Sequence, residues 1–170
     1  CFTRFAVGSL MLATVLLAIS ACPQVSRVTD YTWFGHGQTV LRVYGFFTMT
    51  MFGAIYHIVP QLVGPGRVCP RWMRINFWLV MPGILLLALP LVFGGIAQGL
   101  KFIDATIPFV DVAKSTLMAF RLSTLGETML LLGNLVFLFN IVGAMVSYYR
   151  SVGKTAFAEA TALQPVGVKP

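Results

Sequence analysis

Ionisable side chains inside long apolar stretches are the first candidates for chemistry in this sequence. One stretch holds His36, Arg42 and His57, and a later one holds Glu127. An ionisable group at membrane depth is costly unless it has a partner, so each is a candidate functional residue. Because imidazole ligates haem iron and other metals, His36 is a candidate cofactor ligand. We expect His57, near the other end of its stretch, to be an interfacial or packed histidine.

Arg42 and Glu127 are the candidates for an ion pair. Both are expected about one or two helical turns inside the same membrane surface, and an unpaired arginine at that depth would cost a few kcal/mol. We therefore predict an Arg42–Glu127 pair. Two alternatives are a haem propionate of a neighbouring subunit as the partner of Arg42, and an arginine that reaches the outer headgroups by itself.

Composition identifies the class of protein that must position these groups. The 170 residues are 58% hydrophobic and only 10% charged, with a mean hydropathy of +0.85, which is too few charges for a soluble globule. About 20 apolar residues cross a bilayer as a helix. Four apolar windows reach that length, so we predict an all-α membrane protein with four transmembrane helices, at residues 5–26, 43–66, 75–100 and 128–149.

The remaining segments complete the predicted organisation. Residues 1–150 form a single four-helix domain, and residues 151–170 form a cytoplasmic tail without a fold of its own. Between the third and fourth windows, Pro108 opens a short amphipathic pattern up to Phe120, which predicts a separate interfacial helix on the outer surface.

Basic residues predict the orientation. Most of them, including Arg67, Arg71, Arg74 and Arg150, fall on the side of the two termini, so the positive-inside rule makes both termini cytoplasmic. The net charge of +7 then indicates contact with anionic lipid headgroups. A nucleic-acid partner is not expected, because the basic residues are split among short segments.

Small and amide side chains predict how the helices pack. Gly94, Gly95 and Gly99 allow close approach of a neighbouring helix, and Asn134 and Asn140 can hydrogen-bond to other helices. The three cysteines form no disulfide framework, and the sequence holds no Cys-x-x-Cys-His for covalent haem attachment.

Several of these segments carry a family resemblance. The sequence resembles helices nine to twelve of the catalytic subunit, subunit I, of cbb-type haem–copper cytochrome c oxidases. The similar segments are Phe52-Gly53-Ala54-Ile55-Tyr56, Gly94-Gly95-Ile96-Ala97-Gln98-Gly99-Leu100, Leu131-Leu132-Gly133-Asn134 and Phe137-Leu138-Phe139-Asn140. The resemblance implies a multi-pass protein of the bacterial cytoplasmic (inner) membrane and a place in the respiratory chain.

The resemblance also implies where haem would be held. In that family a His-x-His pair at the start of the tenth helix ligates two haems, and the copper ligands come from earlier helices. Counting back from Phe52, the pair falls on Gln38 and Val40. Counting forward from Thr29, it falls on Gly35 and Gly37, so the pair is lost and His36 is the nearest histidine.

We therefore expect a haem-free, oxidase-derived subunit with a structural or docking role in a respiratory or electron-transfer complex, without a cofactor of its own and not catalytic alone. The expected partners are other membrane subunits, c-type cytochrome subunits on the outer face, and lipids. One alternative is a split catalytic fragment of a haem–copper oxidase or nitric oxide reductase, with a haem b held through His36 at an interface. Another is a small transporter or assembly factor.

Overall fold

The structure is a computed structural model that describes residues 1–64, 66–104, 106 and 108–162. It is helical throughout this part of the chain, which contains no strand. The elements in order are α1 (Phe2–Ser20), α2 (Pro23–Thr29), α3 (Phe34–Val40), η1 (Leu41–Thr48), α4 (Met49–Val63), α5 (Pro70–Ile103) and α6 (Phe109–Ala162). Four helical rods are long and apolar enough to cross a membrane, which confirms the predicted all-α fold with four spans.

The second span is a composite rod made of α3, η1 and α4. Its middle part, η1, is a π-helix of eight residues, in which hydrogen bonds link residues five positions apart. Thr48 Oγ1 adds a bond of the same spacing to the carbonyl oxygen of Val43, at 3.1 Å. The span begins at Phe34 rather than at the predicted residue 43, so His36 and Arg42 belong to the helix itself.

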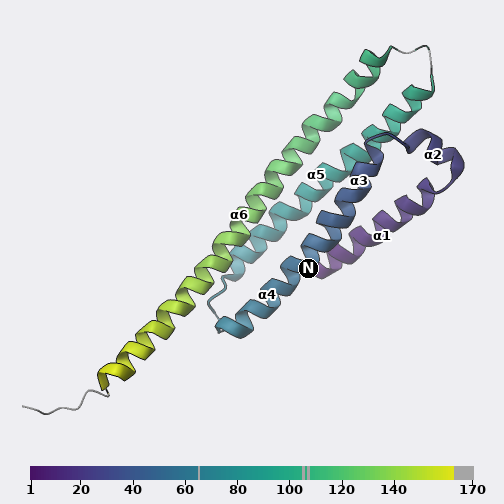
Figure 1. The fold of residues 1–170 in the computed structure, drawn as a ribbon. Coiled ribbons are helices and arrows are strands. Elements are labelled where there is room, and N and C mark those ends of the chain that lie inside the picture. The colour runs from purple at the N-terminus through teal and green to yellow at the C-terminus, as the bar shows by residue number, and fades with distance from the viewer. Residues whose placement is uncertain (65, 105, 107, 163–170) are drawn as a thin grey trace, which may run out of the picture.

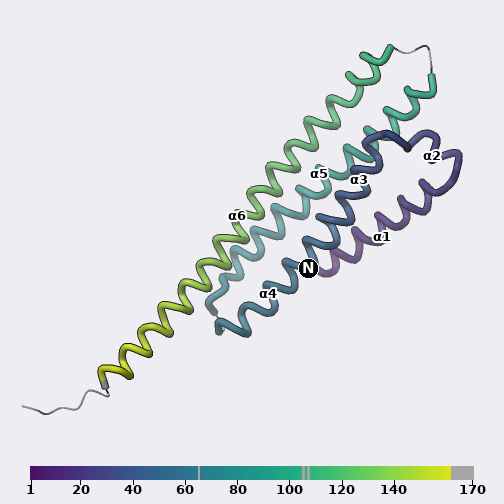
Figure 2. Tube along the Cα trace, viewed as in Figure 1, coloured from purple at the N-terminus to yellow at the C-terminus, as the bar shows by residue number. Residues whose placement is uncertain are grey.

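Seen as in Figures 1 and 2, the four rods form a layer in the order α6, α5, second span and α1, and α6 also contacts α4. One side of α5 packs against α6 and another packs against α3 and η1, while α1 packs against η1 and α4. The helix α2 crosses the end of this layer, where it contacts α5. Proline at the first position starts both α2 and α5, a position at which its missing N–H is harmless.

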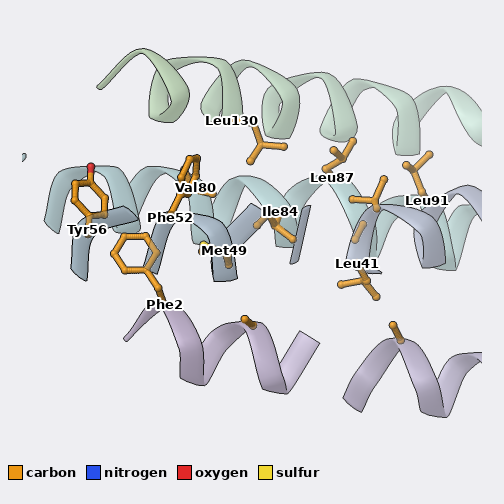
Figure 3. Packing of buried hydrophobic residues seen from close by; sticks show 14 residues of the cluster. Phe2, Leu41, Met49, Phe52, Tyr56, Val80, Ile84, Leu87, Leu91 and Leu130 are labelled. Carbon is orange, nitrogen blue, oxygen red and sulfur yellow. The ribbon is translucent and has the colours of Figure 1, made fainter. Parts of the chain in front are cut away.

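The core runs through the junction of α1, the second span and α5. Leu41, Met49 and Ile84 are fully buried there, and Figure 3 shows them between the α1 and α6 ribbons. At one end Phe2 packs edge-on against Phe77, with ring centroids 5.1 Å apart. The aromatic contact fixes the start of α1 against α5.

The last helix corrects two predictions. α6 is one helix of 54 residues, about 80 Å long at 1.5 Å per residue, against a hydrocarbon core of about 30 Å. The amphipathic segment ending at Phe120 is therefore the first part of α6 and not a separate interfacial helix. The tail predicted to lack a fold is helical to Ala162, and residues 163–170 lie outside the described residues. No proline occurs between Phe109 and Ala162 to end the helix.

Candidate functional site

Three of the predicted site residues face one cavity. His36 of α3 and Glu127 and Asn134 of α6 are exposed and line a cavity of about 490 Å³. We call this cavity the polar groove. Its complete lining is His36, Thr39, Val40, Val43, Tyr44, Leu87, Glu127, Leu130, Leu131 and Asn134.

The groove arises because the second and fourth spans stand on either side of α5. Leu87 of α5 lines the groove between them. The backbones of α5 and α6 approach closely here, since a Cβ on Gly126 would lie 2.7 Å from the carbonyl oxygen of Gly83. Glycine at this contact brings the α6 wall of the groove against α5.

Aromatic contacts bridge the second and fourth spans beyond both ends of the groove. Trp33 and Phe120 meet at right angles with centroids 4.9 Å apart, before His36 on one span and Glu127 on the other. Phe52 and Phe137 meet at 4.5 Å, beyond Tyr44 and Asn134. Between these contacts the two spans stay apart, and the polar side chains line the opening.

The imidazole of His36 is oriented but has no polar partner within the described residues. Trp33 packs edge-on against it, with centroids 5.8 Å apart, and Trp33 is itself held by Phe120. Neither ring nitrogen of His36 hydrogen-bonds to a described residue. Both nitrogens are therefore free for a group outside this chain.

The predicted Arg42–Glu127 ion pair is not formed. Among the described residues the structure has one ion pair, between Lys114 Nζ and Asp111 Oδ1 at 3.8 Å. Arg42 is exposed on η1 but does not line the groove, whereas Val43 and Tyr44 of the same element do, so Arg42 lies on another face of the helix. The prediction considered the depth of Arg42 in the membrane and not the face of the helix.

The glycines of α5 lie against three different elements. A Cβ on Gly95 would overlap the backbone of Phe34, one on Gly99 would overlap the carbonyl group of Val28, and one on Gly94 would lie 2.7 Å from Ala119 Cβ. Each of these distances is shorter than a side chain allows. The geometry supports the predicted packing role.

Asparagines tie α6 to α5 and the loop that precedes it. Asn140 accepts a hydrogen bond from the Cys69 amide at 3.3 Å and donates one to the Cys69 carbonyl oxygen at 3.4 Å. Asn76, which the sequence analysis missed, donates to the Gly133 carbonyl oxygen at 3.2 Å. Asn134 faces the groove instead, so the two predicted asparagines have different surroundings.

The sequence analysis also missed Thr39 and Tyr44 as groove residues. A signal for them was present, since Thr39, Val40, Val43 and Tyr44 follow His36 at spacings of three, four, seven and eight residues. These spacings place side chains on one helical face.

The positions implied for haem ligands do not fit two haems held by this chain. Gln38 is only 4% exposed, and its Nε2 donates to Ser20 Oγ of α1 at 3.4 Å. A Cβ on Gly37 would lie 2.7 Å from a methyl group of Val92, so that position is filled by packing. His57 lies about 30 Å along the same rod from His36, beside Gln61 at 3.2 Å, so the two histidines cannot face one haem. Of these residues, His36 is the histidine exposed in the groove, and it would be the one to hold such a group.

Comparison with known proteins agrees with this fold. The sequence model of the family "Cytochrome C and Quinol oxidase polypeptide I" matches residues 1–129. The chain is 28% identical over 157 residues to a "Cytochrome c oxidase subunit 1 homolog" of Agrobacterium tumefaciens (strain T37), covering 88% of this chain and 28% of that protein. It is 29% identical over 132 residues to the "Cbb3-type cytochrome c oxidase subunit CcoN1" of Stutzerimonas stutzeri, covering 74% and 27%.

These matches confirm the resemblance drawn from the sequence. The chain spans less than a third of the length of these relatives, and its match to the family model covers the first three spans and the beginning of the fourth. It is a multi-pass membrane protein by the length and composition of its helices. The chain belongs to the cytochrome c and quinol oxidase polypeptide I family.

Proposed function

We propose that this chain is a structural membrane subunit of a respiratory or electron-transfer complex, in which a neighbouring subunit covers the polar groove. The observation that carries the proposal is that His36, Glu127 and Asn134, which lie on membrane-spanning helices, are exposed and line one cavity. Ionisable groups that face lipid cost a few kcal/mol, and in membrane proteins they face protein or a polar cavity instead. A partner at the groove removes that cost.

We propose further that the chain carries no haem of its own. Support comes from the positions aligned with the family's ligand pair, of which Gln38 and Gly37 are used in contacts with α1 and α5. Gly35, Gly37 and Val40 have no side-chain donor atom for iron, and the one polar residue of the four, Gln38, is hydrogen-bonded to Ser20. The proposed setting is the bacterial inner membrane, with both termini cytoplasmic and c-type cytochrome subunits as neighbours on the outer face.

One observation favours an alternative. His36 is exposed in the groove with both ring nitrogens free of described partners, so His36 would hold a haem b seated at an interface with a partner chain through one ring nitrogen. In that case the chain is a split catalytic part of a haem–copper oxidase or a nitric oxide reductase. A ligating histidine commonly donates its second N–H to a carboxylate or carbonyl group, and Glu127 in the same groove would be the candidate acceptor.

A haem assay on the purified complex separates the two functions. Haem per chain is measured by the pyridine haemochrome spectrum, with metal analysis, for the native chain and for His36→Ala. His57→Ala is the matched control, since His57 is also exposed on the second span. We expect unchanged haem content and an intact complex in both variants. Loss of one b-type haem per chain in His36→Ala alone would overturn the haem-free proposal and establish the catalytic alternative.

A further inference from the structure

A second groove lies along the distal part of α6, far from the polar groove. It has a volume of about 670 Å³, and we call it the basic groove. Its lining comes entirely from α6, namely Phe139, Val142, Gly143, Val146, Ser147, Arg150, Ser151 and Lys154. A smaller cavity of about 280 Å³ adjoins it, because both are lined by Phe139 and Gly143, and this cavity reaches Arg67 and Trp72.

Three cations gather at one end of the basic groove. Arg150 and Lys154 line it and are exposed. Arg67 reaches the same place from the α4–α5 loop, where its Nη2 donates to Ser151 Oγ at 2.8 Å and its guanidinium carbon lies 5.3 Å from the centre of the Tyr148 ring. A guanidinium group has five N–H donors, so Arg67 keeps donors for a further acceptor.

Acidic residues do not neutralise these cations. Of the five Asp and Glu residues in the chain, Asp30, Asp104 and Asp111 lie at the opposite end of the layer and Glu127 lies in the polar groove. Glu159 follows Lys154 by five positions, about 140° around the helix, so it faces away from the groove. The end that holds Arg150 and Lys154 therefore carries a net positive charge.

The remainder of the basic groove is apolar and has a defined length. Phe139, Val142 and Val146 are exposed along it. From Phe139 to Arg150 the helix rises about 16 Å, which is close to half of a hydrocarbon core of about 30 Å. Cations at one end of a one-leaflet apolar track complement a molecule with an anionic headgroup and an acyl chain.

From this arrangement we infer that the basic groove binds an anionic phospholipid. Arg150, Lys154 and Arg67 hold the phosphate group, and an acyl chain lies along Phe139, Val142 and Val146 over the uncovered face of Gly143. Basic pockets at the membrane surface attract anionic lipids by this combination of charge and depth. A free phosphate ion would use the cations but would have no use for the apolar track. The inference is independent of the function proposed for the polar groove.

The charge contribution is tested on the full chain, purified in detergent and titrated with phosphatidylglycerol or phosphatidylcholine. Bound lipid is counted by native mass spectrometry. For Arg150→Gln/Lys154→Gln we expect phosphatidylglycerol affinity to fall about 30-fold, at about fivefold per cation near the surface. The control Lys114→Gln/Arg121→Gln removes two exposed cations from the other end of α6, and we expect less than a twofold change.

A second pair of variants tests the apolar track without changing charge. A Cβ on Gly143 or on Gly153 would meet no atom within 4 Å, so a leucine side chain starts into open space at either position. Gly143→Leu fills the basic groove and should lower phosphatidylglycerol affinity several-fold, whereas Gly153→Leu, outside the groove, should not.

Three results would overturn the inference. They are equal binding of phosphatidylcholine and phosphatidylglycerol, equal losses in the variants and their controls, and displacement of bound phosphatidylglycerol by inorganic phosphate. The last result would assign the cations to a free anion instead of a lipid.

Discussion

His36 of α3 and Glu127 of α6 line the same cavity, although they lie on the second and fourth spans and neither contacts a charged residue within the described chain. Two ionisable groups of different spans therefore face one opening at the side of the protein. Arg42, which lies deeper in the second span than His36, does not line this opening. This relationship underlies the proposal that the chain completes its polar groove with a neighbour.

Glu127→Leu tests whether Glu127 interacts with a neighbouring subunit or with a residue of its own chain. Because Glu127 is exposed and makes no ion pair in the described chain, the free energy of unfolding of the isolated chain should change by no more than about 0.5 kcal/mol. The same substitution should weaken association with the rest of the complex. Unfolding in detergent and co-purification measure the two effects. A loss of several kcal/mol in the isolated chain would instead point to an internal pair with Arg42.

Substitution of Gly99 tests the close approach of α5 and α2. The new methyl group of Gly99→Ala would overlap the Val28 carbonyl group, and overpacking of this kind costs about 1–3 kcal/mol. Gly35→Ala is the control, since a Cβ there meets no atom within 4 Å, and it should be neutral or stabilise α3 by about 0.5–1 kcal/mol. Equal unfolding free energies for the two variants in a detergent titration would argue against the packing role.

The two asparagines of α6 should respond differently to leucine. Asn140→Leu leaves the Cys69 amide without its acceptor and removes one of two donors to the Cys69 carbonyl oxygen, which still accepts from the Met73 amide at 3.3 Å. The lost amide partner should lower the unfolding free energy of the chain by about 1–3 kcal/mol. Asn134→Leu removes an exposed side chain that makes no hydrogen bond in the described chain, so the isolated protein should be unaffected. In thermal unfolding, the midpoint of Asn140→Leu should lie below that of Asn134→Leu. Equal midpoints would mean that the two asparagines pack alike.

The turn after α5 contains a carboxylate with a shifted titration. Thr106 donates to Asp104 Oδ1 through its hydroxyl at 2.6 Å and through its amide at 3.0 Å, and these bonds hold the pKa of Asp104 below its usual 3.8. Because the pKa of Asp104 is lower in the folded state than in the unfolded state, ionised Asp104 stabilises the turn at pH values above its usual pKa. That stabilisation is lost as pH falls through the lowered pKa.

Thr106→Val removes the hydroxyl donor and keeps the amide. The pKa of Asp104 should then move back toward its usual value, because one of its two donors is lost. Carboxyl carbon NMR on Asp-labelled protein follows the titration directly. Identical midpoints in the native and variant chains would show that the hydroxyl bond does not form.

The sequence was sufficient for the spans but not for the groove. Apolar windows locate transmembrane helices because the bilayer sets a minimum length, and all four appear in the structure. The start of the second span was placed too late because Arg42 lies outside an uncharged window, although an arginine can remain helical at this depth. The continuity of α6 could have been predicted from the lack of proline between Phe109 and Ala162.

The angular positions explain what was missed at the site. Pairing Arg42 with Glu127 used depth alone, whereas contact between helices depends on the face that each residue occupies. The π-helical segment η1 has no simple sequence signal. The polar groove lies where α3 and η1 are separated from α6, with Leu87 of α5 between them. To predict the polar groove, one would have needed to know how the second span, α5 and α6 cross.

The most direct test of the central claim is photo-cross-linking from the polar groove in native membranes. A photoreactive residue replaces Leu131, which lines the groove and is 61% exposed. The control replaces Phe93, which is 67% exposed on α5 outside the groove. We predict that position 131 yields adducts with a membrane subunit of a respiratory complex, identified by mass spectrometry, and that position 93 yields lipid adducts. Lipid adducts alone at position 131 would contradict a groove covered by a neighbouring subunit.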